Sequence, residues 1–263
     1  METARPYRLD DLRRFATALA AGAGLAPARA SALATLLLWF DAAGASESGI
    51  ATLPDLLARI DRGEVDPSSE GIIRGEHSAT LTLDGGRGVP PLILARAAAL
   101  AAEKARDVGV GLVRVTSLGP CGPAAAVAAE AAIGPEVALI LGPGPSWTMA
   151  VPSPEGLPLI VDSALGAVAG PPPLDLFPWV LLVPEGGWLV AALAIRALEP
   201  LGTFHERVGA ALKALPESPG RLLPASLEAR RRAARELGVP IAVAPMAELL
   251  GRAEGLAIPP PGR

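Results

Sequence analysis

The feature that most constrains the fold is a change in the spacing of apolar residues near residue 80. Before it, between residues 9 and 62, apolar side chains recur at the three- and four-residue spacing of amphipathic helices, as in Leu12 and Phe15. After it, Leu81 and Leu83 alternate with threonines, which is the period of a half-buried strand. We therefore expect a helical layer first, followed by a part built on strands.

The remaining pattern predicts strands that alternate with helices, and hence an α/β fold with a mixed or parallel central sheet. The expected helices after the first layer cover residues 90–107, 123–133, 188–198, 206–215 and 226–237, and the expected strands cover 111–115, 137–141, 157–161 and 239–243, followed by a proline-rich tail. The segment 166–187 is too rich in proline for a helix or a central strand and is expected to be a connection. We expect three parts: a helical part at 1–75, an α/β core at 76–200 with a reduced cofactor-binding region, and C-terminal helices and a strand at 201–263 that return to the first part.

Composition excludes several classes of protein. Hydrophobic residues make up 51% of the 263 residues, but no apolar run reaches the roughly 18 residues of a membrane-spanning helix, and the first residues are too acidic for a signal peptide. We expect a soluble, cytoplasmic protein without a membrane partner. The net charge is -4 and arginines alternate with acidic residues, so no nucleic-acid partner is expected. The single Cys121, with His77 and His205 far apart, excludes an internal disulfide and argues against a metal site.

The amide and basic residues are strongly biased. The chain contains no Asn and no Gln, 28 Pro, and only two Lys against 21 Arg. This composition is typical of a thermophilic protein that has lost its thermolabile amides. A GC-rich genome would produce part of the same bias.

Six segments in a fixed order carry a resemblance to a known family. They read WFDAAGASESGIATLPDLLARIDRGEVDP, LTLDGGRG, EKARDVGVGLVRVTS, LPLIVDSALGAVAG, PEGGWLVAAL and ERVGAALKALPESPGRLLPASLEARRRAARELGVPI. Because of these six segments, the chain resembles the type-2 malate/L-lactate dehydrogenase family, whose members are NAD(P)-dependent reductases of 2-oxo acids and cyclic imino acids. The resemblance implies a helical N-terminal layer, a central sheet that is not of Rossmann type, and a homodimer whose subunits share each active site.

The loop that carries the family's proton donor differs in this chain. The family reads Ser-His-Gly there, followed three residues later by an Arg that holds the substrate carboxylate. Aligned on Gly49, this chain has Glu47, Ser48 and Thr52 instead. A hydroxyl does not titrate near neutral pH, so Ser48 cannot replace an imidazole. Glu47 is either a replacement acid, since a desolvated carboxyl can titrate near neutrality, or a solvated loop carboxylate.

Two further landmarks of the resemblance are also altered. The family's Ser-Asn-His-Phe-Gly corresponds to residues 117–121, without the His, and its Pro-Leu-Gly-Gly-x-Lys-Gly corresponds to a stretch in which Leu189 replaces the Lys. Gly186 and Gly187 are the cofactor-binding candidates that persist there. Asp162 also persists, either as a relict that supported the lost His or as a cap for the following helix or turn. The chain is shorter than its relatives in the loops that close over nicotinamide and substrate.

Four other features have two interpretations each. The stretch GPGPS at 142–146 is either a phosphate-binding loop or a rigid turn, and its prolines remove N–H donors that a phosphate loop needs. Cys121 precedes a helix and is either activated or an inert small side chain. His77 and His205 are either catalytic or simply exposed. Trp188 and its neighbour turn a cofactor-facing strip into an apolar one that packs within the fold or against another chain.

These observations lead to two hypotheses. In the first, the chain has the family's fold, has lost hydride transfer, binds no cofactor, and acts as a binding or assembly subunit in a homodimer or a heterodimer with a related chain. In the second, it is a diverged oxidoreductase that uses NAD or NADP and Glu47, or a water held by Ser48 and Asp162, to reduce a 2-oxo acid or a cyclic imine.

Overall fold

The computed structural model describes residues 4–143, 146–165, 187–216, 218 and 220–262. They belong to two compact units, one formed by Met1–Ser69 with Glu228–Arg263 and the other by Glu70–Leu227. The chain passes from the second unit to the first within α8 (Pro224–Leu237). Residues 201–227, which the sequence assigns to a C-terminal part, therefore lie in the second unit.

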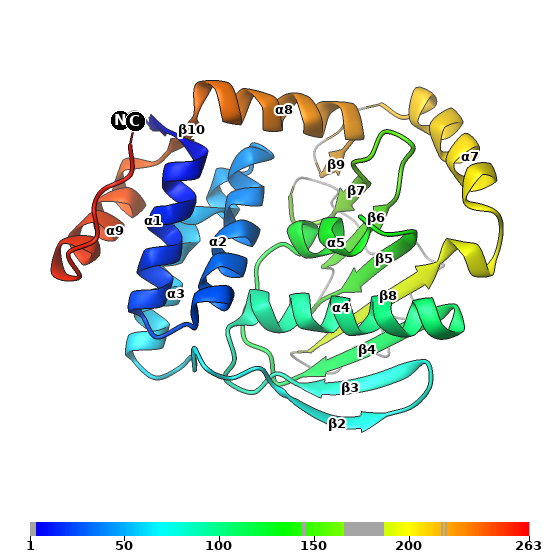
Figure 1. The fold of residues 1–263 in the computed structure, drawn as a ribbon, viewed down its shortest axis with the longest axis horizontal. Coiled ribbons are helices and arrows are strands. Elements are labelled where there is room, and N and C mark those ends of the chain that lie inside the picture. The colour runs from blue at the N-terminus through cyan, green and yellow to red at the C-terminus, as the bar shows by residue number, and fades with distance from the viewer. Residues whose placement is uncertain (1–3, 144–145, 166–186, 217, 219, 263) are drawn as a thin grey trace. The chain divides into compact units, whose positions relative to one another are not determined.

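The first unit is a layer of helices built from both ends of the chain (Figure 1). Its elements are β1 (Arg5–Tyr7), α1 (Leu9–Gly22), α2 (Pro27–Ala42), the short 3-10 helices η1 (Ser46–Ser48) and η2 (Ile50–Thr52), α3 (Leu53–Asp61), β10 (Val239–Ile241) and α9 (Val243–Gly255). β1 pairs antiparallel with β10, and α9 contacts α1 and α3. The expected N-terminal helices are confirmed. The expected strand at 239–243 is shorter, and α9 replaces most of the expected tail.

The helices of this unit follow the apolar spacing. In α1 the buried side chains include Leu12, Phe15 and Leu19, which form one face against α2. α2 begins with Pro27 in its first turn, where a missing N–H costs nothing, and its last seven residues are all buried. One of those seven is Asp41, a carboxylate inside an apolar layer.

The second unit is an eight-stranded sheet in the order β2-β3-β4-β8-β5-β6-β7-β9. Its elements are β2 (Ile72–Glu76), β3 (Thr80–Asp84), α4 (Pro90–Val108), β4 (Val110–Thr116), α5 (Ala125–Ala131), β5 (Glu136–Leu141), β6 (Trp147–Val151), β7 (Leu159–Asp162), β8 (Trp188–Ala194), the 3-10 helix η4 (Ile195–Ala197), α7 (Leu201–Ala214) and β9 (Arg221–Leu222). Only β3 and β4 are parallel among these described strands, and every other adjacent pair is antiparallel. The mixed α/β sheet expected from the sequence is confirmed.

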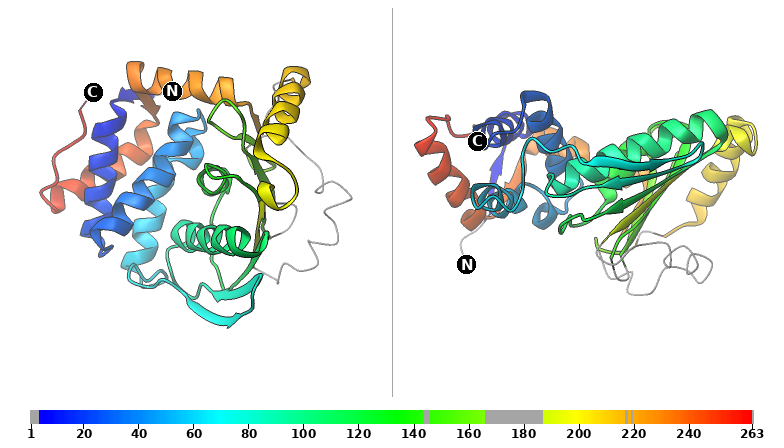
Figure 2. Two further views of the ribbon diagram at one scale, coloured as in Figure 1. Left: turned by 45° about the vertical axis from the view of Figure 1, so that its right-hand side comes forward. Right: turned by 90° about the horizontal axis from the view of Figure 1, so that it is seen from below.

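One face of the sheet carries the core of this unit. α4 and α5 lie on the same face (Figure 1, Figure 2), and α4 contacts β4 and β8 while α5 contacts β5, β6 and β7. Alternate residues point into this layer, among them Val113, Ile140 and Ile160, all fully buried. Among the described residues, no helix is both long and apolar enough to cross a membrane.

The helix expected at 188–198 is wrong. Residues Trp188–Ala194 form β8, which lies between β4 and β5 and aligns Val190 with both Val113 and Ile140. The sequence WLVAALA is apolar on every side, and an apolar run of this kind fits a buried helix as well as a central strand. Its alanines favour a helix by local propensity, but pairing with two neighbouring strands satisfies the backbone and decides the outcome.

Candidate functional site

The loop that follows α2 forms two short 3-10 turns, η1 and η2, in the first unit. Glu47 is exposed and Ser48 is half-buried. Thr52 uses its hydroxyl within the loop, because Oγ1 donates to the carbonyl oxygen of Gly49 at 2.8 Å. The three positions that differ from the family's motif therefore present one solvated carboxylate, one partly covered hydroxyl and one hydroxyl already bonded to the backbone.

The buried Asp41 side chain holds this loop in place through hydrogen bonds. Its side chain is 3% exposed, and Oδ2 accepts the N–H of Ile50 at 2.8 Å. The Ser46 hydroxyl also donates to this carboxylate, whereas Oδ1 has no partner among the described residues. Burial raises the pKa of the Asp41 carboxyl from its ordinary 3.8 to about 7, and the two hydrogen bonds act in the opposite direction.

Gly49 is the residue that lets Asp41 reach the loop. A Cβ atom built on Gly49 would lie 2.3 Å from Asp41 Oδ2 and 2.4 Å from its Cγ. The carboxylate is thus packed directly against the Gly49 backbone, where any side chain would displace it. The sequence analysis did not predict that Asp41 is buried against this loop. The only indication in the sequence is a single carboxylate at the end of the apolar run LLLWF.

Asp162 is the corresponding buried carboxylate of the second unit, at the end of β7. Its side chain is 1% exposed, Oδ2 accepts the Thr148 hydroxyl at 2.8 Å, and Oδ1 accepts the N–H of Ala164 at 2.8 Å. The N–H groups of Ala124 and Ala125, at the start of α5, also donate to it. Burial raises the pKa of the Asp162 carboxyl against these hydrogen bonds. The carboxylate therefore caps both the turn after β7 and the first turn of α5.

The strip that the resemblance assigns to cofactor contacts is apolar and closed. Leu189 is 4% exposed and packs in a cluster with Leu141 and Trp147. Trp188, also 4% exposed, covers Gly142, on which a built Cβ atom would lie 2.6 Å from the indole Cζ3. Gly187 is buried beside them, and the other glycine candidate, Gly186, lies outside the described residues.

The remaining candidates lie apart from these contacts. In the segment 142–146 the N–H of Gly142 donates to the carbonyl oxygen of Ser146 at 2.8 Å, which closes a turn between β5 and β6, and residues 144–145 lie outside the described part. His77 is exposed after β2, His205 is half-buried in α7, and Cys121 is half-buried. Among the described residues, no three His, Cys, Asp or Glu side chains are placed to hold a metal ion.

The candidates of the sequence therefore divide between the two units. Glu47 and Ser48 belong to the first unit, and Asp162 and Gly187 belong to the second. Within the first unit, the structure brings Asp41, Ser46 and Gly49 together. Within the second, it brings Asp162 to Thr148. In both places the polar groups bind the protein's own backbone and hydroxyl groups.

Comparisons with known proteins agree with this fold. A family model described as malate/L-lactate dehydrogenase matches residues 7–141. The structure is similar to malate dehydrogenase from Entamoeba histolytica, with a TM-score of 0.82 at 16% identity over 97% of this chain and 99% of that one. It is similar to malate dehydrogenase from Pyrococcus horikoshii OT3, with a TM-score of 0.84 at 17% identity over 99% and 98%. It is also similar to delta1-piperideine-2-carboxylate reductase from Pseudomonas syringae, with a TM-score of 0.75 at 16% identity over 95% and 100%. No curated protein matches the sequence.

Proposed function

Because the chain belongs to the malate/L-lactate dehydrogenase family, we propose that it keeps the family's fold without hydride transfer and acts as a binding or assembly subunit. Its solved relatives are named as dehydrogenases and a reductase, so this role departs from theirs. The observation that carries the proposal is the buried apolar strip at 187–189. A cytoplasmic location and a thermophilic source stay predictions from the sequence.

The strip supports the loss of cofactor binding. Family enzymes use NAD(P), and the resemblance places a lysine at the position of Leu189. Here Leu189 fills a cluster with Leu141 and Trp147, and Trp188 covers Gly142. A buried leucine side chain offers no hydrogen-bond donor. Opening the cluster would expose apolar surface to water, at a free-energy cost of about 25 cal/mol per Å². These residues do not fit a dinucleotide, and we propose that none binds.

The loop after α2 supports the loss of proton transfer. Ser48 cannot supply a proton near neutral pH, and the Thr52 hydroxyl is bonded to Gly49. A missing general acid alone lowers a rate by about two to four orders of magnitude. Asp41 has the pKa of a general acid, but it is 3% exposed and faces the loop backbone. We assign it to holding the loop.

Enzyme assays test this part of the proposal. We would measure the oxidation of NADH and NADPH with pyruvate, oxaloacetate and a cyclic imino acid as oxidants. The proposal predicts no turnover above the rate without protein. Turnover that disappears in a Glu47→Gln variant would contradict it.

The alternative function is a diverged NAD(P)-dependent oxidoreductase that reduces a 2-oxo acid or a cyclic imine. One observation favours it: the Glu47 carboxylate makes no ion pair with the described residues and is accessible to a substrate. Its exposure also leaves it without the desolvation that a replacement acid needs, which makes this function the alternative. If this function holds, Glu47→Gln should abolish reductase activity and Ser48→Ala should reduce it less. Activity that survives Glu47→Gln unchanged would remove Glu47 from the mechanism.

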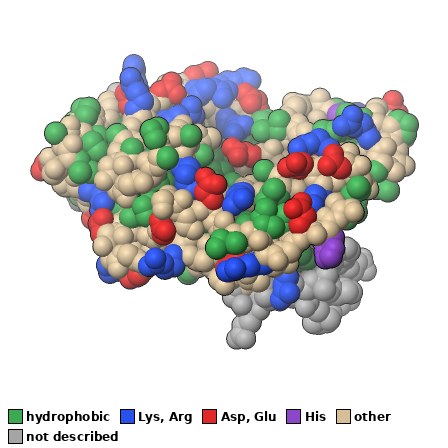
Figure 3. All heavy atoms as spheres, turned by 60° about the horizontal axis from the view of Figure 1, so that its bottom comes forward, with side chains coloured by type: hydrophobic (Ala, Val, Ile, Leu, Met, Phe, Trp, Pro, Cys, Tyr) green, Lys and Arg blue, Asp and Glu red, His purple; other side chains and the backbone are tan. Residues whose placement is uncertain are grey.

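Assembly is the second part of the proposal. An interface depends on buried apolar area and shape, so it can outlast an active site that depends on a few polar groups. On the face drawn in Figure 3, basic and acidic side chains are interspersed, which favours a protein partner over nucleic acid. We propose a two-fold homodimer, or a heterodimer with a related chain, that buries more than about 2,000 Å².

Light scattering measures this assembly directly. The chain has a mass of 26.6 kDa, so a homodimer has twice that mass. The purified protein is run alone and together with any related chain from the same source. A clean monomer mass in both samples would count against the assembly.

A further inference from the structure

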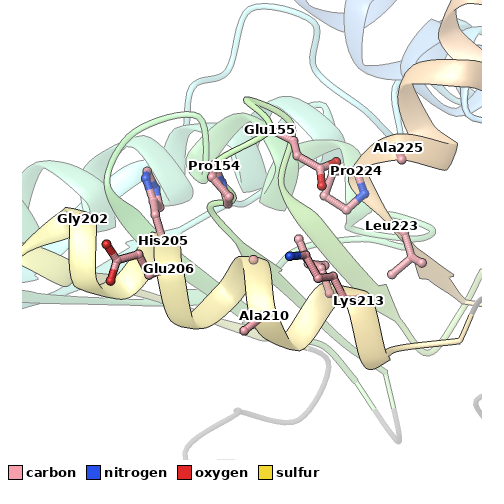
Figure 4. A pocket seen from close by; sticks show the side chains of 12 residues that line it. Pro154, Glu155, Gly202, His205, Glu206, Ala210, Lys213, Leu223, Pro224 and Ala225 are labelled. Carbon is pink, nitrogen blue, oxygen red and sulfur yellow. The ribbon is translucent and has the colours of Figure 1, made fainter.

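A cavity of about 590 Å³ lies within the second unit, away from the residues discussed above except His205. Figure 4 shows α7 on one side and the loop 152–158 between β6 and β7 on the other. Leu223 and the first two residues of α8, Pro224 and Ala225, line it as well. Cavities of about 300–1,000 Å³ are the usual size of small-molecule sites.

The helical wall is shaped by three residues four positions apart. His205, Gly209 and Lys213 line the cavity from α7, and this spacing places them along one side of the helix. A Cβ atom built on Gly209 would meet Pro154 at 3.5 Å, so helix and loop are close together at that level. His205 lies one turn before this contact and Lys213 one turn after it.

The loop wall is held by its own hydrogen bonds. Ser153 is 7% exposed, and its Oγ donates to the carbonyl oxygen of Leu157 at 2.7 Å and accepts the N–H of Glu155 at 3.1 Å. The N–H of Gly156 donates back to the carbonyl oxygen of Ser153 at 3.3 Å. This tight turn presents the Glu155 side chain to the cavity, as Figure 4 shows.

The charged side chains that line the cavity, Glu155, Glu206 and Lys213, make no hydrogen bond or ion pair with the described residues. His205 makes no side-chain hydrogen bond there either, and its ring lies against that of Phe204. Arg207 on the same helix is different, because its guanidinium is paired with Glu199 at 2.9 Å. The charge of Arg207, which lies outside the cavity, is therefore neutralised within the fold, whereas the charged side chains around the cavity remain available to a ligand.

We infer that this cavity binds a small amino acid with a basic side chain. The three charged side chains of the lining, one lysine and two glutamates, have a net charge of -1, which a ligand of net charge +1 would balance. The ligand's carboxylate would bind Lys213, its α-ammonium Glu155, and its side-chain cation Glu206, since charge-assisted hydrogen bonds are the strong ones. Leu223 and Pro224 supply an apolar surface for the ligand's methylene groups.

Other ligands fit this lining less well. A simple anion would meet two carboxylates for one lysine. A metal ion lacks the required donors, because no three metal-binding side chains are suitably placed among the described residues. The inference also stands independently of hydride transfer, since none of these residues belongs to the loop after α2 or to the strip at 187–189.

Calorimetric titration of the full chain with L-lysine and L-ornithine at low salt tests the inference. We expect a dissociation constant of about 1 mM or tighter, because the site is open and its ion pairs are partly solvated. L-norleucine, which lacks the side-chain cation, and cadaverine, which lacks the carboxylate, should each bind at least about tenfold more weakly.

Two variants and one control locate the binding. Lys213→Met and Glu206→Gln change exposed side chains, so they should fold normally and weaken L-lysine binding at least about tenfold. Glu103→Gln, an exposed glutamate on α4 outside the cavity, should leave it unchanged. The inference is overturned if no heat is detected with either amino acid at 10 mM or so, if both variants bind like the wild type, or if norleucine binds as well as lysine.

Discussion

Asp41 and Asp162 are two buried carboxylates, one in each unit, and they differ in how many hydrogen bonds they accept. Both are at most 3% exposed, and burial raises the pKa of each. Asp162 receives a hydroxyl and three backbone N–H groups, so its acceptor capacity is used by the fold. Asp41 receives the Ile50 N–H and the Ser46 hydroxyl, and its Oδ1 has no partner among the described residues.

The difference shows that the two carboxylates have different roles in their units. Asp162 ties a turn and a helix start together and has no capacity left for a ligand. Asp41 holds the backbone of a loop whose residues Glu47, Ser48 and Thr52 differ from the family's motif, and one of its oxygens stays unpaired among the described residues.

The largest expected effect is the loss of the Asp162 carboxylate. Asp162→Ala would leave the Thr148 hydroxyl and the N–H groups of Ala124, Ala125 and Ala164 unpaired inside the protein. Each unpaired buried group costs about 1–3 kcal/mol, so we expect the free energy of unfolding to fall by more than about 4 kcal/mol. Urea denaturation measures it. Asp162→Asn keeps one acceptor oxygen, so its free energy of unfolding should fall less. Small and equal losses in both variants would show that the Asp162 carboxylate is not needed to pair these buried groups.

The second effect is a pH dependence of stability that the buried Asp41 carboxyl should impose. The folded-state pKa of Asp41 is about 7 against an ordinary 3.8, so the folded protein holds this proton more tightly than the unfolded chain. The stabilisation is complete below pH 4 and is lost as the pH rises through about 7, a change on the order of 4 kcal/mol.

Asp41→Asn isolates the contribution of this titration to stability, because the amide keeps an acceptor for the Ile50 N–H and carries no charge. Unfolding free energies measured from pH 4 to pH 8 should fall more steeply with pH in the wild type than in the variant. The variant should be the more stable protein at pH 8. Parallel curves for the two proteins would show that Asp41 does not titrate in this range.

A third and smaller effect concerns the contact between Gly49 and Asp41. A Cβ atom at 2.3 Å from a buried carboxylate oxygen forces the loop or the carboxylate to move, so Gly49→Ala should cost about 2 kcal/mol. Gly251 in α9 is the matched control, because a Cβ atom there meets nothing within 4 Å. Gly251→Ala should stabilise the protein by about 0.5–1 kcal/mol. Equal effects of the two substitutions would rule out the close packing.

The smallest effect is expected at Glu47. Its side chain is exposed, so Glu47→Gln should change the free energy of unfolding by less than about 0.5 kcal/mol. Thermal unfolding at pH 7 measures this. A loss of more than about 1 kcal/mol would mean that Glu47 supports the loop as Asp41 does.

The sequence predicted the parts of the fold that local patterns determine. The spacing of Leu12 and Phe15 predicted α1, and the family resemblance supplied the sheet type. Local patterns could not place Trp188–Ala194 in a strand, because the pairing of β8 with β4 and β5 comes from distant segments. The burial of Asp41 and the cavity beside α7 were missed for the same reason, since both depend on residues brought together only by folding.

A titration of the protein with NADH and NADPH in a calorimeter tests the central claim most directly. We predict no binding at micromolar concentrations of either dinucleotide, because Leu189 and Trp188 close the strip where cofactor contacts are expected. Subtracting the heat of dilution into buffer gives the baseline for each titration. A dissociation constant in the micromolar range for either dinucleotide would show that the cofactor site is intact and would favour the oxidoreductase alternative.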